Sequence, residues 1–170
     1  EIVPLANGDF FVLDGYGSDY ILRFNARGKF LNAFGGGLGK GEAKLAHWGP
    51  HGGNIDRREP EKPILILGLS DQQKIKRFTL DGKWIDTFPF PGGNPRDILF
   101  HRGHMFVPHL GDDWPKQRNN PGFISVLDHD FKVVANLGGQ APLYLRGELQ
   151  PMHHNTHAFY HPHAMCIARD

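Results

Sequence analysis

The chain has 170 residues, a length that suits one domain with a hydrophobic core. Hydrophobic residues make up 39% and charged residues 22%, so a globular fold is expected, and the 22 glycines and 13 prolines are typical of an all-β protein with many turns. The net charge of +1 and the scattered basic residues argue against nucleic-acid binding, and no apolar run is long enough to span a membrane.

A strand–turn–strand pattern recurs along the chain. It is clearest in residues 21–34, where Gly28 suits the turn because it tolerates a positive φ. The pattern returns in residues 75–88 with the hairpin signal Asp81-Gly82, and more weakly in residues 124–137. The copies begin 54 and then 49 residues apart, and such a period indicates a β-propeller or a related array.

The first repeat covers about residues 1–37 and the second about residues 48–90. Strands are expected near residues 2–5, 10–14, 20–24 and 30–34, and then near 53–57, 63–69, 74–78 and 84–88. The continuously apolar Ile64–Leu67 is typical of a strand covered on both faces by neighbouring blades. We interpret the glycine-rich run from Gly35 to Gly41 as a crossover loop, because no helix start follows that would make it a phosphate cradle.

The third repeat covers about residues 94–138. Its strands are expected near residues 98–101, 104–108, 123–127 and 133–137. The insertion Leu110–Pro121 carries Asp112-Asp113-Trp114, and a long polar insertion of this kind often lines a site. Residues 160–170 are expected to supply the first strand of a further blade, in which Cys166 is a buried and inert thiol.

Three repeats leave two open sheet edges, and a propeller hides its edges by closing into a ring. We therefore expect the remaining blades to come from the same longer chain or from a second chain. The chain opens inside an apparent strand and has no starting methionine, which favours a piece of a longer protein.

Histidine is abundant, with 11 copies, five of them between His153 and His163. Composition alone leaves a polar loop and a metal site open as interpretations. The starts of the repeats are more informative, because His51, Arg96 and His163 each follow a proline there. The innermost strand of every blade faces the central channel, so these three side chains are expected to converge. Three imidazoles around a channel hold Zn²⁺ with an open position, and this chain supplies two of them.

Three stretches of the chain resemble a known family. Phe11–Tyr16, Ile21–Phe24 and Gly28–Phe30 are similar to the catalytic core of the peptidyl-α-hydroxyglycine α-amidating lyases, within the wider group of NHL-repeat propellers. That family has a six-bladed propeller with zinc in its channel, held by three histidines from alternate blades. The resemblance therefore implies an all-β, six-bladed propeller of the NHL type.

The resemblance also implies roles for individual residues. His51 and His163 match the family's zinc ligands, the third of which would lie upstream of Glu1, and Tyr16 matches its catalytic tyrosine. Zinc would bind the substrate hydroxyl and lower its pKa, Tyr16 would take the proton, and the carbon–nitrogen bond would break to give an amide and glyoxylate. A structural calcium ion is implied as well, although Ala164 stands where the family has an acidic residue. Relatives of this type are mostly exported, which implies a periplasmic or secreted location.

Arg96 is a further candidate, for catalysis or for binding an anion, with an ion pair to Asp97 or Asp56 as the structural alternative. His109 and His161 are candidates for substrate contact, and the alternative for His109 is a solvated loop.

Aromatic residues have structural alternatives too. Tyr16 also suits a turn with aromatic packing, and Trp48, Trp84 and Trp114 are expected to pack between blades or over loops. We predict a zinc-dependent, lyase-like enzyme that acts on a small hydroxylated or peptide substrate in the propeller channel. The alternative is a non-catalytic NHL propeller that binds a protein, peptide or glycan.

Overall fold

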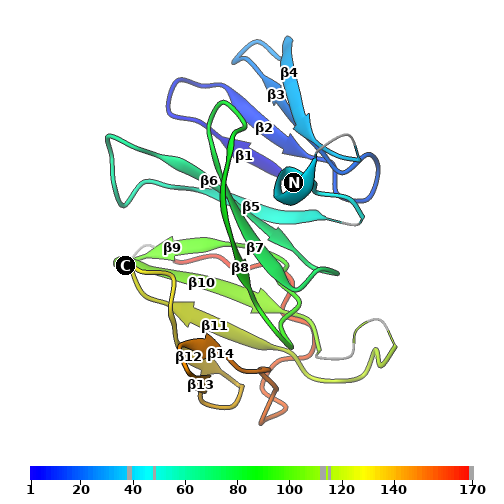
Figure 1. The fold of residues 1–170 in the computed structure, drawn as a ribbon, viewed down its shortest axis with the longest axis vertical. Coiled ribbons are helices and arrows are strands. Elements are labelled where there is room, and N and C mark those ends of the chain that lie inside the picture. Colours follow the sequence, from blue (N-terminus) through cyan, green and yellow to red (C-terminus); the bar gives the residue numbers. More distant parts are fainter. Residues whose placement is uncertain (38–39, 48, 112–113, 115, 169–170) are drawn as a thin grey trace.

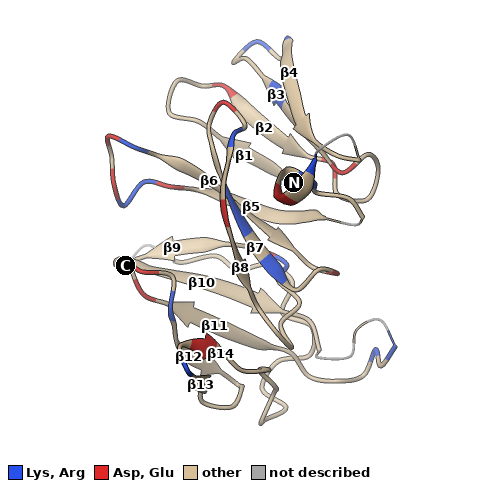
Figure 2. Cartoon of the chain, viewed as in Figure 1, with Lys and Arg blue, Asp and Glu red and all other residues tan. Residues whose placement is uncertain are grey.

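The computed structural model describes residues 1–37, 40–47, 49–111, 114 and 116–168. Three four-stranded antiparallel sheets follow one another along the chain, and the second lies between the other two (Figure 1). Lysine, arginine and acidic residues lie on strands of the first two sheets and in the turns, whereas the strands of the third sheet carry none (Figure 2). Within the described residues, no helix has the length and apolar character needed to cross a membrane.

Each sheet is a meander in which strands adjacent in sequence are paired. Blade 1 consists of β1 (Ile2–Pro4), β2 (Phe10–Leu13), β3 (Tyr20–Phe24) and β4 (Phe30–Gly35). Blade 2 consists of β5 (Pro50–Asp56), β6 (Ile64–Leu69), β7 (Lys74–Thr79) and β8 (Trp84–Pro89). Blade 3 consists of β9 (Leu99–His101), β10 (His104–His109), β11 (Phe123–Leu127) and β12 (Val133–Leu137). The predicted all-β propeller is confirmed, with three blades in this chain.

Two short elements lie outside the blades. A 3₁₀ turn, η1 (Gly41–Ala43), lies between blades 1 and 2. A small hairpin of β13 (Tyr144–Leu145) and β14 (Glu148–Leu149) follows blade 3.

The strand predicted near the end of the chain is wrong. Residues 160–168 form no strand, and Cys166 is exposed instead of buried. An innermost blade strand pairs with the second strand of its own blade, and no described residue supplies that partner. The segment is held from the side instead, because the Met165 N–H donates to Asp97 Oδ2 at 3.1 Å.

The core lies in two layers, one on each face of blade 2. Leu65 and Leu67 of β6 belong to the cluster shared with blade 1, whereas Ile66 belongs to the cluster shared with blade 3. All three side chains are fully buried. Successive residues of a strand point to opposite faces, so a central blade needs apolar residues at every position of its second strand. The uninterrupted Ile64–Leu67 run is explained by this double burial.

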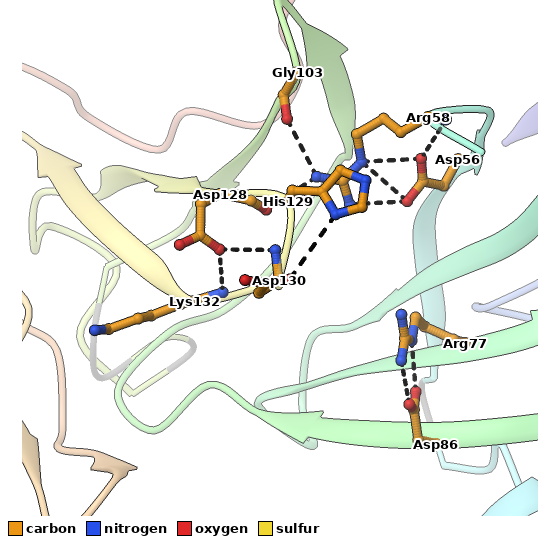
Figure 3. A network of polar contacts seen from close by, with 9 residues as sticks. All are labelled: Asp56, Arg58, Arg77, Asp86, Gly103, Asp128, His129, Asp130 and Lys132. Carbon is orange, nitrogen blue, oxygen red and sulfur yellow. Dashed lines mark hydrogen bonds and ion pairs between the residues drawn. The ribbon is translucent and has the colours of Figure 1, made fainter.

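Blades 2 and 3 are also joined by a polar network at the end of β5. Arg58 follows β5 and pairs with Asp56, with 2.8 Å between Nη2 and Oδ2. The Arg58 Nη1 group donates to the backbone oxygens of Gly103 at 3.2 Å and Asp128 at 2.9 Å, in the turns of blade 3 (Figure 3). One guanidinium therefore bridges two blades.

Phe131 completes this inter-blade clasp, which consists of Arg58, Arg77, Phe88 and Phe131. The Phe131 ring stacks on Phe88 at 5.3 Å, and the guanidinium carbons of Arg58 and Arg77 lie 4.7 and 4.4 Å from its centroid. Arg77 is itself paired with Asp86 (Figure 3). Cations over an aromatic face attract the ring, so the clasp stabilises the contact between the blades.

Substitution of Phe131 by alanine is expected to lower the free energy of unfolding by about 2 kcal/mol, because the ring stack and both cation–π contacts are lost. Urea denaturation measures the change. Leu31→Ala, at a half-exposed position of β4, serves as the control and is expected to cost less than about 1 kcal/mol. Equal losses in the two variants would show that the clasp adds no stability.

Candidate active site

A cavity of about 750 Å³ lies where segments of all three blades and the C-terminal segment meet. Its walls come from the turn after β2, the start of β5, the stretch before β9, the insertion after β10 and the residues after His161. His51, Arg96 and His163 all line it, so the structure brings together the three residues that follow a proline.

The turn after β2 positions Tyr16 at the edge of this cavity. The Asp14 carboxylate accepts hydrogen bonds from the Ser18 backbone N–H at 3.0 Å and the Ser18 hydroxyl at 2.7 Å, which closes the turn. Gly15 passes so close to β5 that a Cβ there would lie 2.2 Å from the Pro50 oxygen. Glycine at this position therefore lets the turn approach β5, and Tyr16 faces His51.

The hydrogen bonds of His51 define its tautomer. Its Nδ1 lies 2.9 Å from the Arg96 backbone oxygen. A carbonyl only accepts, so Nδ1 carries the hydrogen and Nε2 carries a lone pair. Nε2 lies 2.9 Å from Tyr16 Oη and accepts the phenol hydrogen. The two rings meet edge to face, with 5.3 Å between their centroids.

Arg96 holds the other side of the same phenol. Its Nη1 donates to Tyr16 Oη at 3.0 Å, and only 5% of the residue is exposed. Burial lowers the pKa of the guanidinium, and the contact with Tyr16 opposes this effect. The predicted pairing with Asp56 is wrong, because Asp56 binds Arg58 instead. Asp97 also has other partners, since its carboxylate accepts the backbone N–H groups of Ile98 and Met165.

The two channel histidines lie beside each other, with 4.7 Å between the ring centroids of His51 and His163. Burial lowers the pKa of His51 to about 4, and the positive charge of Arg96 adds to this effect although the hydrogen bond to the Arg96 carbonyl opposes it. Burial and then Arg96 also lower the pKa of His163, against the influence of Asp97. Both imidazoles are therefore neutral at pH 7, the form that binds a metal or accepts a hydrogen bond.

This pair fits part of a zinc site. Metal-ligating histidines usually donate their second ring N–H to a carbonyl or carboxylate, as His51 does to Arg96. Zinc sites use at least three protein ligands, and the described part of the chain holds no group of three or more histidine, cysteine or acidic side chains placed for one ion. His51 and His163 would supply two ligands, and the third is not among the described residues.

The insertion after β10 forms another part of the cavity wall. Trp114 and Arg118 line it together with His161, and Trp114 packs over a loop there, which is one of the two arrangements expected for the tryptophans. The indole meets the His161 ring edge to face at 5.2 Å, and the Arg118 guanidinium carbon lies 5.5 Å from the indole centroid. Asp112, Asp113 and Trp48 lie outside the described residues.

His109 lies elsewhere. It is the last residue of β10, is fully buried and is not part of the cavity wall. The expectation of a solvated loop at this position is wrong, because β10 extends through His109 to pair with Phe123 of β11.

Glu1 and Arg118 also line the cavity, and no local pattern in the sequence indicates this. The Glu1 carboxylate accepts the Gly53 N–H at 3.0 Å. Burial raises the pKa of this carboxyl to about 7, and the neighbouring Asp97 carboxylate adds to the rise. Neither residue belongs to a repeated motif, so only the fold shows that they line the same cavity as Tyr16.

No family model matches the chain, and no curated protein matches it. Among solved structures, hydrazine synthase of Kuenenia stuttgartiensis is similar, with a TM-score of 0.58 and 14% identity over 95% of this chain and 36% of that one. A protein of unknown function from Bacteroides caccae has a TM-score of 0.50 and 14% identity, covering 86% of this chain and 53% of that one. At these identities the similarity concerns the fold alone. The chain spans about a third of the first structure and about half of the second.

Proposed function

We propose that this propeller is an enzyme that acts on a small hydroxylated substrate, with Tyr16 as its acid–base group. One observation carries the proposal. The Tyr16 oxygen is bonded to His51 Nε2 on one side and to Arg96 Nη1 on the other, at the edge of a cavity and from three separate segments of the chain. A titratable group held by a base and a cation within a pocket is typical of acid–base catalysis.

Arg96 has the clearest role in this arrangement. Its Nη1–H points at the phenol oxygen, so it stabilises negative charge on that atom and favours Tyr16 as a base. Arg96 is a buried residue, and a charge–charge interaction is stronger away from water. His51 fixes the direction of the phenol from the other side.

The reaction that we propose is carbon–nitrogen bond cleavage in an α-hydroxyglycine-type substrate. Tyr16, in its ionised form, takes the hydroxyl proton, and the oxygen electrons form the new carbonyl group of glyoxylate. The carbon–nitrogen electron pair leaves with the nitrogen. Tyr16 then returns the proton to that nitrogen, which gives the amide. The resemblance of Phe11–Tyr16 to the amidating lyases supports this choice of reaction.

Zinc is the second part of the proposal. His51 would hold it through the lone pair of Nε2, so the hydrogen bond that Nε2 now accepts from Tyr16 would give way to the metal, and His163 would be its neighbouring ligand. A zinc ion bound there would increase the acidity of the substrate hydroxyl.

Metal analysis tests this part. We expect close to one zinc ion per chain in protein purified without chelators, and loss of that zinc in the variant with His51→Ala and His163→Ala. His104→Ala, at an exposed position on β10, is the control and should keep the zinc. If the unmutated protein contains no metal, the zinc part of the proposal is wrong. The role of Tyr16 and Arg96 is then tested by the activity measurement alone.

Turnover is tested by incubating the protein with N-acyl-α-hydroxyglycines and measuring glyoxylate. Release that depends on the protein supports the lyase proposal. If no member of such a series is cleaved with zinc supplied, the proposal fails and a non-catalytic binding propeller becomes the better explanation.

A further inference from the structure

The Arg96 guanidinium is a buried cation with too few partners. It is 5% exposed, its Nη1 donates to the Tyr16 oxygen, and its Nε has no hydrogen-bond partner among the described residues. No ion pair joins it to an acidic side chain in that part of the chain, and Asp71 acts on it only through the field of its charge. Burying a charge is unfavourable unless it is paired, so an anion is the missing partner.

Four carboxylates line the cavity. Asp14 is bound by Ser18, Asp97 and Glu1 are bound by backbone N–H groups, and Asp71 forms no ion pair with Arg96 within the described residues. Asp97 accepts the Ile98 N–H at 2.7 Å and the Met165 N–H at 3.1 Å. Glu1 accepts the Gly53 N–H. Because none of these four acids pairs with Arg96 within the described residues, an anion for Arg96 is expected from a bound ligand.

The size and wall of the cavity indicate the rest of this ligand. A volume of about 750 Å³ is in the range of sites that enclose drug-sized molecules, so a two-carbon acid would fill only a small part of it. The indole of Trp114 lines the same cavity, flanked by Arg118 and His161. The polar groups of Arg118 and His161 are therefore part of the same wall as the indole. Such a wall suits a flat ring that carries some polar edge.

We propose that the ligand of this cavity is an aromatic carboxylate, whose carboxylate binds the Arg96 guanidinium and whose ring lies against Trp114. The planar fork of an arginine matches the two oxygens of a carboxylate, and a lysine does not reproduce this geometry. This inference rests on the proposed function, because it names the substrate class of the same site.

Calorimetric titration of the purified protein with three probes tests the inference. Benzoate carries both features, benzamide keeps the ring without the charge, and acetate keeps the charge without the ring. We expect benzoate to bind at least about tenfold more tightly than either of the others, since a charge-assisted pair and a buried ring each contribute about that factor. Equal binding of benzoate and benzamide would overturn the carboxylate assignment, and equal binding of benzoate and acetate would overturn the aromatic one.

Variants locate the two contacts. Arg96→Gln should weaken benzoate binding by about 10- to 100-fold and leave benzamide binding unchanged, while Arg96→Lys should show a smaller loss. Trp114→Ala should weaken benzoate binding toward that of acetate. The control Arg27→Gln, in the exposed turn between β3 and β4, should bind benzoate as the unmutated protein does. Unchanged binding in Arg96→Gln would overturn the inference. Thermal melting shows whether the Arg96→Gln variant is folded. If it is not, the comparison of benzoate, benzamide and acetate on the unmutated protein still tests the inference.

Tyr16→Phe separates this inference from the proposed function. It should keep benzoate affinity within about threefold, because the carboxylate binds other donors of Arg96, and it should lose turnover. Arg96-dependent benzoate binding without any turnover would refute the proposed enzymatic activity and would still support an aromatic carboxylate as the ligand. Turnover with no Arg96-dependent binding of benzoate would refute the aromatic-carboxylate ligand and would leave the proposed enzymatic activity standing.

Discussion

Replacing Tyr16 with phenylalanine is expected to lower kcat for glyoxylate release by about 10²- to 10⁴-fold, the usual contribution of a positioned acid–base group. The substitution removes only the oxygen that joins His51 Nε2 to Arg96 Nη1. The ring can keep its edge-to-face contact with His51. Because the residue is 70% exposed, the free energy of unfolding should change by less than about 1 kcal/mol.

The matched control for this experiment is Tyr160→Phe. Tyr160 is 62% exposed, packs near His157 and does not line the cavity, so its hydroxyl should be dispensable. Steady-state rates of glyoxylate release, with urea denaturation of each variant, separate a catalytic effect from a loss of structure. A Tyr16→Phe enzyme with the kcat of the unmutated protein would exclude Tyr16 as the acid–base group.

The blades could be predicted because their signals are local. Hairpin residues such as Asp81-Gly82 and the apolar run Ile64–Leu67 depend on short stretches, and each of these stretches lies in blade 2 where it was expected. The final strand could not be predicted in the same way. Residues 162–168 have an apolar pattern, but a strand exists only with a ladder partner, and no described residue provides one.

The sequence predicted which residues come together at the site, but it did not predict the hydrogen bonds that they form there. The shared proline indicated that His51, Arg96 and His163 approach one place, and all three line the cavity. The hydrogen bond between Tyr16 and Arg96 joins residues 80 positions apart, and it depends on side-chain directions that no local pattern contains. His109 shows the same limit, since only its pairing with Phe123 reveals that it is buried.

Acidification is expected to destabilise the protein through His109, which lies in the core of blade 3. The imidazole is fully buried, and its ring centroid lies 5.5 Å from that of Phe90 and 4.6 Å from that of Phe123. Its Nε2 lies 2.9 Å from the Ser125 hydroxyl, which donates its own hydrogen to Asn136 Oδ1 at 2.8 Å. Nε2 is therefore the nitrogen that carries the hydrogen in the neutral ring.

A second proton would have no acceptor within the described structure. It would enter at Nδ1, which is buried without a hydrogen-bond partner and lies close to the backbone of Gly93. Burial lowers the pKa of His109 to about 3, whereas an exposed histidine has a pKa near 6.5. Between these two values the unfolded chain binds more protons than the folded one, so stability falls as the pH falls through this range.

At pH 4.5 the loss due to His109 should be about 2 to 3 kcal/mol relative to pH 7. His51, with its pKa lowered to about 4, should add a loss in the same direction, so His109 must be isolated by substitution. His109→Gln keeps a donor for Ser125 and has no titrating ring, and it should lose less stability than the unmutated protein between the two pH values. Urea denaturation at pH 7 and pH 4.5 gives both differences. If both proteins lose the same free energy of unfolding between pH 7 and pH 4.5, protonation of His109 does not cause the acid destabilisation. A smaller loss in His109→Gln would identify this buried imidazole as one of its causes.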